Sequence, residues 1–261
     1  MRISRIARHL SDVARRLRHP SAPAFRKSVY GPLLLDTPGD RTFALCLTGY
    51  GPFVAERIAG YGRDFLFLDI GANLGLFSLL ADRQPLCRRA LAFEPLPSVF
   101  ASLLANLERN SAAKVTAHCC AISAAGGHVE LSYNPAHSGM SKVMPQRGPG
   151  TVRASAIGAT ELDRLVGDPQ GDILAKIDVE GSELAVLSIL RQTSFYPAIK
   201  AIIIEVSEHN LAGEDKAGLL ALLASEGFVE MSRSGTEDHY DAYYARQDAA
   251  DQKAAAPTLS G

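Results

Sequence analysis

Short unbroken apolar segments alternate with amphipathic segments over most of the chain after residue 60. Strands without polar alternation are buried on both faces, which is typical of a parallel sheet covered by helices. The first three segments begin about 25 residues apart, the length of one strand-helix unit. The pattern therefore predicts a doubly wound α/β domain over residues 61–245. The five predicted strands are FLFLD (65–69), ALAFE (90–94), KVTAHCC (114–120), ILAKID (173–178) and AIIIEV (201–206).

The first 60 residues have a different pattern. Apolar residues at helical spacing in residues 1–18, with six arginines between them, predict a basic amphipathic helix. We expect this helix to cover the edge of the core; contact with an anionic membrane surface or an acidic partner is the alternative. Prolines make residues 19–38 a connector, and residues 41–58 predict a hairpin that turns at Gly49 and Gly51.

Two later regions also interrupt the alternation. Residues 124–152 are rich in glycine and proline and predict a long loop, either functional or disordered. The segments FVEMSRS and YDAYYAR, after residue 227, predict two closing strands that pair antiparallel. The small residues of 246–261 predict a flexible tail.

Composition narrows the class of protein. Lys and Arg number 27 against 28 Asp and Glu, so the net charge of −1 does not call for a nucleic-acid partner. The four cysteines lack metal-ligand spacing, which indicates a reducing compartment. No apolar run approaches the length of a membrane span. We therefore expect a soluble cytoplasmic protein; nothing in the sequence indicates its oligomeric state.

The segment LDIGANLGLFS (68–78) predicts a buried strand that enters a glycine-rich turn and then a helix. Gly71 and Gly75 allow a ligand to approach the backbone, beside the free N–H groups of the helix start. Asp69 would repel a phosphate but attract an ammonium group, whereas Asn73 and the following N–H groups suit a carboxylate. This asymmetry indicates an amino-acid zwitterion as part of the ligand.

Glu94 ends the second strand, about 20 residues past the glycine turn, where an acid binds ribose hydroxyls in Rossmann-like sites. Together with Asp69 it favours adenosine joined to an amino acid, which is S-adenosylmethionine. The less favoured interpretation is that both are ordinary acids at strand ends. Neither GxxxxGK[ST] nor GxGxxG occurs, which disfavours a P-loop protein and an NAD-dependent oxidoreductase.

A second group of acids lies in KIDVEGSE (176–183), where Asp178 ends the fourth strand and Glu180 lies in the turn. Glu205, on the neighbouring strand, is a further candidate. One carboxylate can act as general base toward an acceptor hydroxyl, or the three can bind a divalent ion such as Mg²⁺. Glu183 is expected to point to water near the helix start.

Three further features are weaker candidates. His209 follows the fifth strand and is either a base or, as we prefer, a loop residue or helix cap. Lys176 is expected to be structural, or an ion-pair partner of the acids. Within the glycine- and proline-rich segment, some residues can close over an acceptor: Ser138, Met140, Ser141 and Lys142.

Taken in order, these motifs resemble the FkbM family of S-adenosylmethionine-dependent methyltransferases. The resemblance covers residues 65–206, with GYGPF (49–53) as a lead-in. It implies a seven-stranded Rossmann-like sheet, mostly parallel, whose last strand is antiparallel. It also implies methyl transfer, typically to a hydroxyl of a sugar, polyketide or other small metabolite. The segments that carry it are LDIGANLGLFS, FEPLPSVFASLLANLERN, TELDRLVG, ILAKIDVEGSELAVLSIL and IIIEV.

The resemblance also implies a role for individual residues. Asp69 would hold the methionine amino group, directly or through water, and Glu94 would bind the ribose, with Pro95 fixing the turn after it. Adenine would lie at Ala121 and its neighbours, with His118 or Ser123 as alternatives. The residues expected to wrap the methionine part are Gly71, Ala72, Asn73 and Gly75.

The acceptor implied is a small molecule or glycan precursor methylated on oxygen, and N-methylation is a close variant. The alternative from another class is a catalytically inactive module that binds S-adenosylmethionine as a scaffold. The acids at 178, 180 and 205 argue against it, because costly buried carboxylates have no use in a dead enzyme.

Overall fold

A computed structural model of the protein describes residues 24–124, 126–211 and 213–247. The helix predicted over residues 1–18 and residues 248–261 of the predicted tail lie outside the described residues. The predicted tail begins at residue 246, but Arg246 is the last residue of strand β13 (His239–Arg246). None of the helices in the described ranges is long and apolar enough to cross a bilayer.

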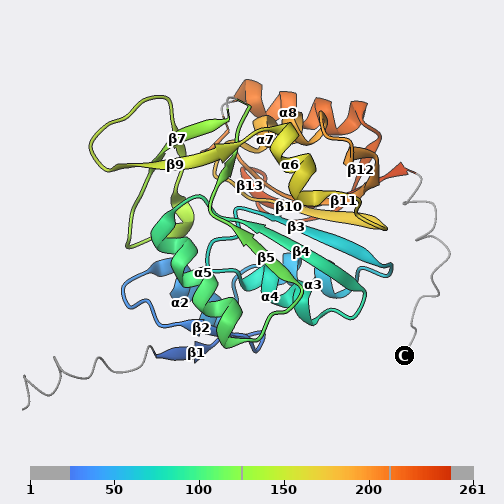
Figure 1. The fold of residues 1–261 in the computed structure, drawn as a ribbon. Helices are drawn as coiled ribbons and strands as arrows, with labels where there is room; N and C mark the ends of the chain where they lie inside the picture. The colour runs from blue at the N-terminus through green and yellow to red at the C-terminus, as the bar shows by residue number, and fades with distance from the viewer. Residues whose placement is uncertain (1–23, 125, 212, 248–261) are drawn as a thin grey trace, which may run out of the picture.

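A seven-stranded sheet forms the centre of the described structure (Figure 1). Its strands are parallel except β13, which pairs antiparallel with β11 on one side and with β12 on the other. The doubly wound fold with an antiparallel last strand is thereby confirmed. In spatial order the strands are β12 (Phe228–Gly235), β13 (His239–Arg246), β11 (Ile199–Ser207), β10 (Asp172–Ile177), β3 (Phe65–Ile70), β4 (Cys87–Phe93) and β5 (Val115–His118).

Helices cover both faces of this sheet (Figure 1). On one face lie α6 (Ala159–Val166), α7 (Glu183–Leu190) and α8 (Gly213–Ser225), and on the other α3 (Pro52–Ala59), α4 (Leu76–Arg83) and α5 (Pro97–Arg109). Side chains alternate along β3, so Leu66 and Leu68 pack in the core with α6 and α7, whereas Phe65 and Phe67 pack with α3 and α4. All six residues of β3 are buried, which explains its unbroken apolar sequence.

The hairpin predicted over residues 41–58 is wrong: the segment forms two helices, α2 (Arg41–Thr48) and α3. Asp40 caps α2 by accepting the N–H of Thr42 (3.0 Å), and Pro52 occupies the start of α3. The two glycines separate helices instead of turning strands; Gly51 has φ +60°. Apolar residues at helical spacing, such as Phe43 and Cys46, are buried, and this burial outweighs the strand propensity of the segment.

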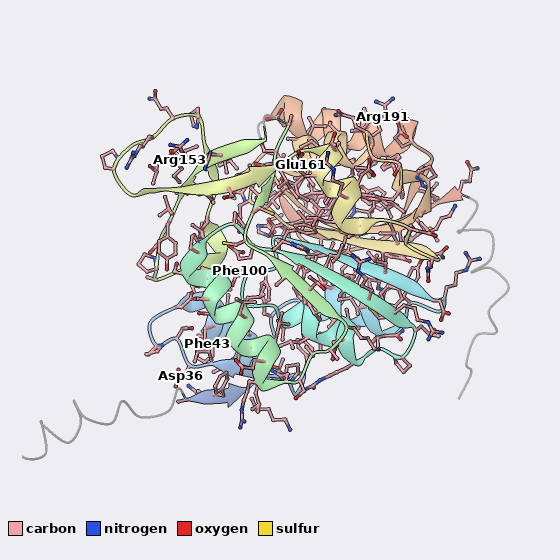
Figure 2. The ribbon with its side chains drawn as sticks, in the orientation of Figure 1. Asp36, Phe43, Phe100, Arg153, Glu161 and Arg191 are labelled. Carbon is pink, nitrogen blue, oxygen red and sulfur yellow. The ribbon has the colours of Figure 1, made fainter. Side chains whose placement is uncertain are left out.

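The loop predicted over residues 124–152 is wrong in part, because β7, β8 and the first two residues of β9 fall within it and pair in a four-stranded sheet of order β6-β9-β7-β8. Part of this sheet projects from the body, and the exposed Arg153 of β9 lies there (Figure 2). The glycines mark its turns, since Gly127 and Gly150 both have positive φ. Its elements are β6 (Ala121–Ile122), β7 (Gly127–Ser132), the 3-10 turn η1 (Ser138–Met140), β8 (Val143–Met144) and β9 (Thr151–Ile157).

A short antiparallel pair, β1 (Phe25–Lys27) and β2 (Leu33–Leu35), replaces part of the predicted connector. It rests on α5, where the Asn106 and Asn110 side chains accept the N–H groups of Leu35 (2.6 Å) and Leu33 (2.9 Å). A further 3-10 turn, η2 (Tyr196–Ala198), leads into β11.

Candidate functional site

A cavity lies at the carboxyl ends of β3, β4 and β10, the edge where open α/β sheets bind ligands. It holds about 940 Å³ of empty space, a figure that includes open solvent at its mouth. Its walls include the turn after β3, the end of β4, the turn after β10 and the segment between β7 and β9, with further residues from α2, α4 and β6.

The turn after β3 forms one wall through Gly71, Ala72 and Asn73. Gly71 has φ +82°, and a Cβ added there would lie 1.8 Å from the backbone oxygen of Asp178. Glycine at this position therefore allows the two turns to touch. Asn73 is a non-glycine residue at φ +48°, a strained conformation of the kind that gathers at functional sites. Gly75 does not line the cavity; its missing Cβ leaves room for Leu103.

Glu94 stands at the end of β4, where the sequence predicts it. Its carboxylate accepts the N–H of Asn73 (3.0 Å) and the N–H of Leu96 (2.9 Å), so the glycine turn and the β4 end are tied together. Burial raises the pKa of Glu94 to about 7, although these two hydrogen bonds oppose the rise. Pro95 and Ala121 line the same cavity, whereas His118 and Ser123 do not.

Asp69 does not line the cavity. It is fully buried, accepts the Ser78 hydroxyl (2.6 Å) and lies 3.6 Å from the Lys176 ammonium. The reason is register: Lys176 lies opposite Asp69 on the neighbouring strand, so its ammonium offsets the buried carboxylate. In this arrangement Asp69 cannot contact a ligand in the cavity directly.

Lys176 is the ion-pair partner that the sequence suggests. Its ammonium also lies 3.2 Å from Asp178 and donates to the backbone oxygen of Gly71 (2.8 Å). Burial lowers the pKa of Lys176, but the nearby Asp178 and Asp69 outweigh that effect and raise it overall. The charged lysine therefore links the β3 turn to the β10 turn.

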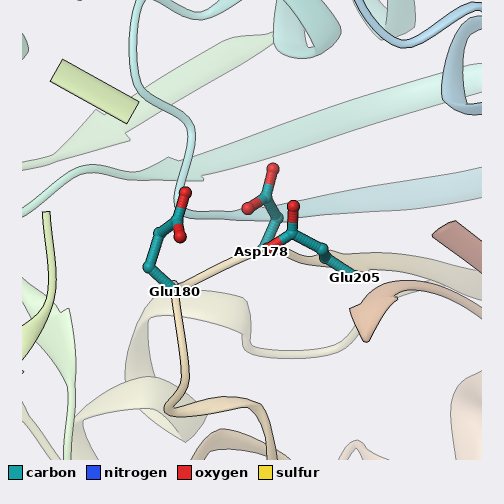
Figure 3. A group of neighbouring side chains, drawn as sticks. All are labelled: Asp178, Glu180 and Glu205. Carbon is teal, nitrogen blue, oxygen red and sulfur yellow. The ribbon is translucent and has the colours of Figure 1, made fainter. Parts of the chain in front are cut away.

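The three acids predicted from sequence come together as a group, here called the acidic group: Asp178, Glu180 and Glu205. One carboxylate oxygen from each lies within 4.8 Å of the other two. Figure 3 shows the three carboxyl groups side by side, on segments that follow β10 and on β11. Asp178 and Glu180 line the cavity, whereas Glu205 does not. The Tyr50 hydroxyl donates to Asp178 at 3.5 Å.

Glu180 has the geometry of a functional residue. Its φ is +56°, a conformation that non-glycine residues rarely adopt, and its carboxylate accepts the Asn210 amide (2.6 Å). Burial raises its pKa to about 7, and the negative charge of Asp178 adds to that effect. Burial, followed by Asp178 and Glu180, also raises the pKa of Glu205 well above its usual value. Protons on these two acids relieve the repulsion within the acidic group.

His239 and Asp241 lie beside the acidic group, although no pattern in the sequence points to either of them. His239 lies with its Nε2 3.0 Å from Glu205, and Asp241 is paired with Glu205 across β11 and β13. Neither is part of a motif; the antiparallel register of β13 brings them there. His209, by contrast, is exposed and does not line the cavity, which agrees with its interpretation as a loop residue.

The expectation for Glu183 is wrong. Its side chain is buried instead of pointing to water, and it accepts the N–H groups of Val179 (3.1 Å) and Gly181 (3.0 Å). The turn after β10 leaves these backbone donors without helical partners, and the carboxylate of Glu183 satisfies them. Glu183 therefore shapes the turn that carries Glu180.

Residues 138–143, here called the strap, run along the mouth of the cavity. Ser138 donates to Asp40 (2.8 Å) at one end, and Lys142 donates to Asn210 at the other. Asn210 in turn binds Glu180, so the strap is tied to the acidic group. Within the strap, Ser138, Gly139, Ser141 and Val143 line the cavity, whereas Met140 and Lys142 do not.

Comparison with known proteins identifies the family. The family model described as "Methyltransferase FkbM domain" matches residues 69–230, more than half of the chain. The chain belongs to the FkbM methyltransferase family. It is therefore an S-adenosylmethionine-dependent methyltransferase, and the resemblance found in its motifs is confirmed.

Two relatives known by sequence agree with this membership. "Methyltransferase sdnD" of Sordaria araneosa is 30% identical over 66% of this chain and 76% of its own length. "31-O-demethyl-FK506 methyltransferase FkbM" of Streptomyces tacrolimicus is 28% identical over 66% of this chain and 77% of its own length. Among solved structures, M. capricolum TrmK with S-adenosyl-homocysteine has a TM-score of 0.45 at 13% identity, over 75% and 68% of the two chains.

The residues of the cavity fit S-adenosylmethionine. Glu94 keeps acceptor capacity on a carboxylate that already receives two N–H bonds, and an adenosine ribose offers two hydroxyl donors. The turn at residues 71–74 lies at the start of α4, beside this acid. Asp178 and Glu180, of the acidic group, line the same cavity. The acid that can accept ribose hydroxyls, Glu94, and the two acids that can accept a proton, Asp178 and Glu180, therefore line the same cavity.

Proposed function

We propose that this FkbM-family protein transfers the methyl group of S-adenosylmethionine to a hydroxyl of a small metabolite, sugar or glycan precursor. The observation that supports this is a single cavity lined both by Glu94 with the glycine turn and by Asp178 with Glu180. An oxygen acceptor also agrees with the name of the Streptomyces relative, which specifies 31-O-demethyl-FK506.

Several residues would hold the cofactor. Glu94 would accept the ribose hydroxyls, Ala121 would lie against adenine, and the turn from Gly71 to Asn73 would surround the methionine part. Asp69 would act from a distance, by holding Lys176 between the two turns. When bound, the cofactor supplies a methyl group attached to a sulfonium sulfur. The sulfur is the leaving group, and it leaves as a neutral thioether that needs no proton. The protein's remaining tasks are to orient the acceptor and to take up its proton.

Glu180 is the base we favour. A general base works best with a pKa near the operating pH, and burial gives Glu180 a pKa of about 7. The Asn210 amide fixes one oxygen of its carboxylate. The acceptor O–H proton would pass to Glu180 as the new O–CH₃ bond forms, and Asp178, held by Lys176 and Tyr50, would orient the hydroxyl.

The acidic group supports a second candidate role, as ligands of Mg²⁺. Its three carboxylate oxygens lie within 4.8 Å of one another, and one oxygen of Glu205 is buried without a hydrogen-bond partner. Carboxylate oxygens are the ligands that this ion prefers. Bound there, Mg²⁺ would lower the pKa of an acceptor hydroxyl.

Release of S-adenosylhomocysteine in the presence of hydroxylated acceptors tests the proposal. We expect Glu180→Gln to lower turnover by roughly 100-fold or more, the usual contribution of a general base, while cofactor binding is kept. The matched control is Glu237→Gln, an exposed glutamate on the loop before β13, which should retain full activity. Full activity of Glu180→Gln would contradict the base role.

Two further arms of this assay separate the alternatives. Loss of turnover on chelation, with recovery in Mg²⁺, would assign the acidic group to the ion. Amine analogues of each active acceptor test N-methylation directly. Cofactor binding without release of S-adenosylhomocysteine from any hydroxyl or amine acceptor would favour the inactive scaffold.

A further inference from the structure

The glycine-rich turn after β3 uses its backbone donors within the protein. Each of the five N–H groups of residues 71–75 donates to a protein acceptor. The distances are 3.0 Å from Gly71 and from Ala72 to the Phe93 oxygen, 3.0 Å from Asn73 to Glu94, 2.9 Å from Leu74 to the Asn73 side chain, and 2.8 Å from Gly75 to the Ala72 oxygen. The donors left at this turn are the side-chain amide of Asn73 and the N–H groups of the first turn of α4, whose N-cap residue is a glycine.

The side-chain amide of Asn73 has a fixed orientation. Its Oδ1 accepts the N–H of Leu74, and a backbone N–H can face the amide oxygen but not the NH₂ group, so this bond settles which end is which. Oδ1 also lies 3.3 Å from the Ser138 hydroxyl. In the part of the chain that the structure describes, the Nδ2 group donates to no protein atom, and Asn73 lines the cavity. Two N–H donors of one side chain are therefore available to a ligand.

Ser138 reaches this amide from the strap, 65 positions further along the chain. The serine is buried, and its hydroxyl donates to Asp40 (2.8 Å), with Oδ1 of Asn73 as a second, more distant acceptor. Its backbone N–H donates to the other oxygen of Asp40 (3.1 Å). Asp40 is buried as well and caps α2. Two hydrogen bonds to one buried carboxylate therefore set the place of Ser138 against the amide.

The chain on either side of Ser138 is packed closely on the start of α2. The oxygen of Ala136 accepts the N–H of Arg41 (2.9 Å), and the N–H of Gly139 donates to the Thr42 hydroxyl (2.9 Å). A Cβ added at Gly139 would lie 3.0 Å from that hydroxyl oxygen, so glycine lets the strap approach α2. The contact between Ser138 and Asn73 is thus held by several bonds on both sides and does not depend on the side chains of a free loop.

We propose that Ser138 is a positioning residue for the cofactor: held by Asp40, it fixes the Asn73 amide so that Nδ2 donates to the carboxylate of the methionine part. This inference rests on the proposed function, which places the methionine part at this turn, and deepens it by giving the strap a role in cofactor binding. Hydrogen bonds to an ionised carboxylate are stronger than those between neutral groups, so a single amide in a fixed orientation is enough to affect affinity.

Decarboxylated S-adenosylmethionine isolates this contact, because it keeps the adenosine, the sulfonium and the amine and lacks only the carboxylate. Calorimetry on the full-length protein gives the Kd of each ligand, and their ratio is the preference for S-adenosylmethionine. We expect Asn73→Asp to lower this preference at least about tenfold, because aspartate still accepts the Leu74 N–H but replaces the donor by a negative charge. Ser138→Ala should lower it about threefold, since the Leu74 bond still holds the amide.

Asn134→Asp is the matched control. Asn134 is exposed, does not line the cavity, and its Oδ1 accepts a nearby N–H, that of Ala136 (3.0 Å), so the same substitution adds the same charge away from the turn. Binding of the decarboxylated ligand shows that each variant is folded.

Two results would overturn the proposal. One is a preference that Asn73→Asp leaves unchanged, or lowers no more than Asn134→Asp does. The other is a Ser138→Ala variant that binds both ligands more weakly by the same factor, which would assign the serine a purely structural role. If Glu94→Gln weakens the binding of neither ligand, the proposed function itself is contradicted, because the cofactor then lies elsewhere.

Discussion

Replacing Lys176 by methionine tests the charge arrangement beneath the site. The lysine is buried, with its ammonium 3.6 Å from Asp69 and 3.2 Å from Asp178. Methionine fills a similar volume, so the change removes the charge and leaves little cavity. Asp69 would then be fully buried with Ser78 as its remaining side-chain partner. Removing one partner of a buried ion pair costs about 3–5 kcal/mol, and we expect that loss in the free energy of unfolding.

Urea unfolding of four proteins at pH 7 measures the effect: wild type, Lys176→Met, Asp69→Asn and the double variant. Asparagine still accepts the Ser78 hydroxyl but carries no charge, so adding Asp69→Asn to Lys176→Met should restore about 2 kcal/mol or more. A cost below about 1 kcal/mol for Lys176→Met, or an additive loss in the double variant, would refute the reasoning.

The same variant has a predicted pH dependence. Burial raises the pKa of Asp69 and Lys176 opposes that rise, so removing the lysine raises the pKa further. An acid whose pKa is higher in the folded state binds more protons there, and stability falls as pH rises from about 4, its unfolded pKa, through the folded value. The stability gap between wild type and Lys176→Met should therefore narrow from pH 7 to pH 5. A constant gap would contradict this account.

Three further predictions concern the walls of the cavity. Gly71→Ala should cost at least about 2 kcal/mol in stability and abolish cofactor binding, because its Cβ would meet the Asp178 carbonyl at 1.8 Å. Glu183→Gln should cost about 1–2 kcal/mol in urea unfolding, because a glutamine has one acceptor oxygen where the carboxylate uses both against Gly181. The Kd for S-adenosylmethionine should fall about tenfold between pH 6 and pH 8, since ribose hydroxyls favour ionised Glu94 and its pKa is about 7.

Each of these has its own check. Gly62→Ala is the control for the first, because an added Cβ there meets nothing within 4 Å. For the second, an unchanged urea midpoint would show that the turn does not depend on its carboxylate. For the third, the pH dependence should vanish in Glu94→Gln; if it persists there, another group is responsible.

Features set by local sequence could be predicted. Unbroken apolar runs predicted five of the seven strands of the central sheet, because strands buried on both faces consist of apolar residues. Glu94 and Asp178 follow such strands, so the shared edge of the sheet brings them to one cavity. The glycine turn was recognisable because Gly71 has no room for a Cβ.

Features set by partners distant in sequence could not be predicted. Asp69 is turned away from the cavity because Lys176 lies opposite it on β10, a matter of strand register. His239 reaches Glu205 for the same kind of reason. Residues 41–58 became helices because the sheet face offered apolar residues a surface to pack on, which overrides the turn signal of two glycines.

Calorimetric titration of the purified protein with S-adenosylmethionine, and in parallel with NAD, tests the central claim most directly, because it needs no acceptor. We predict micromolar one-to-one binding of S-adenosylmethionine, at least about tenfold weaker binding by Glu94→Gln, and no binding of NAD. Tight binding of NAD, or an affinity for S-adenosylmethionine that Glu94→Gln leaves unchanged, would contradict the placement of the cofactor in this cavity.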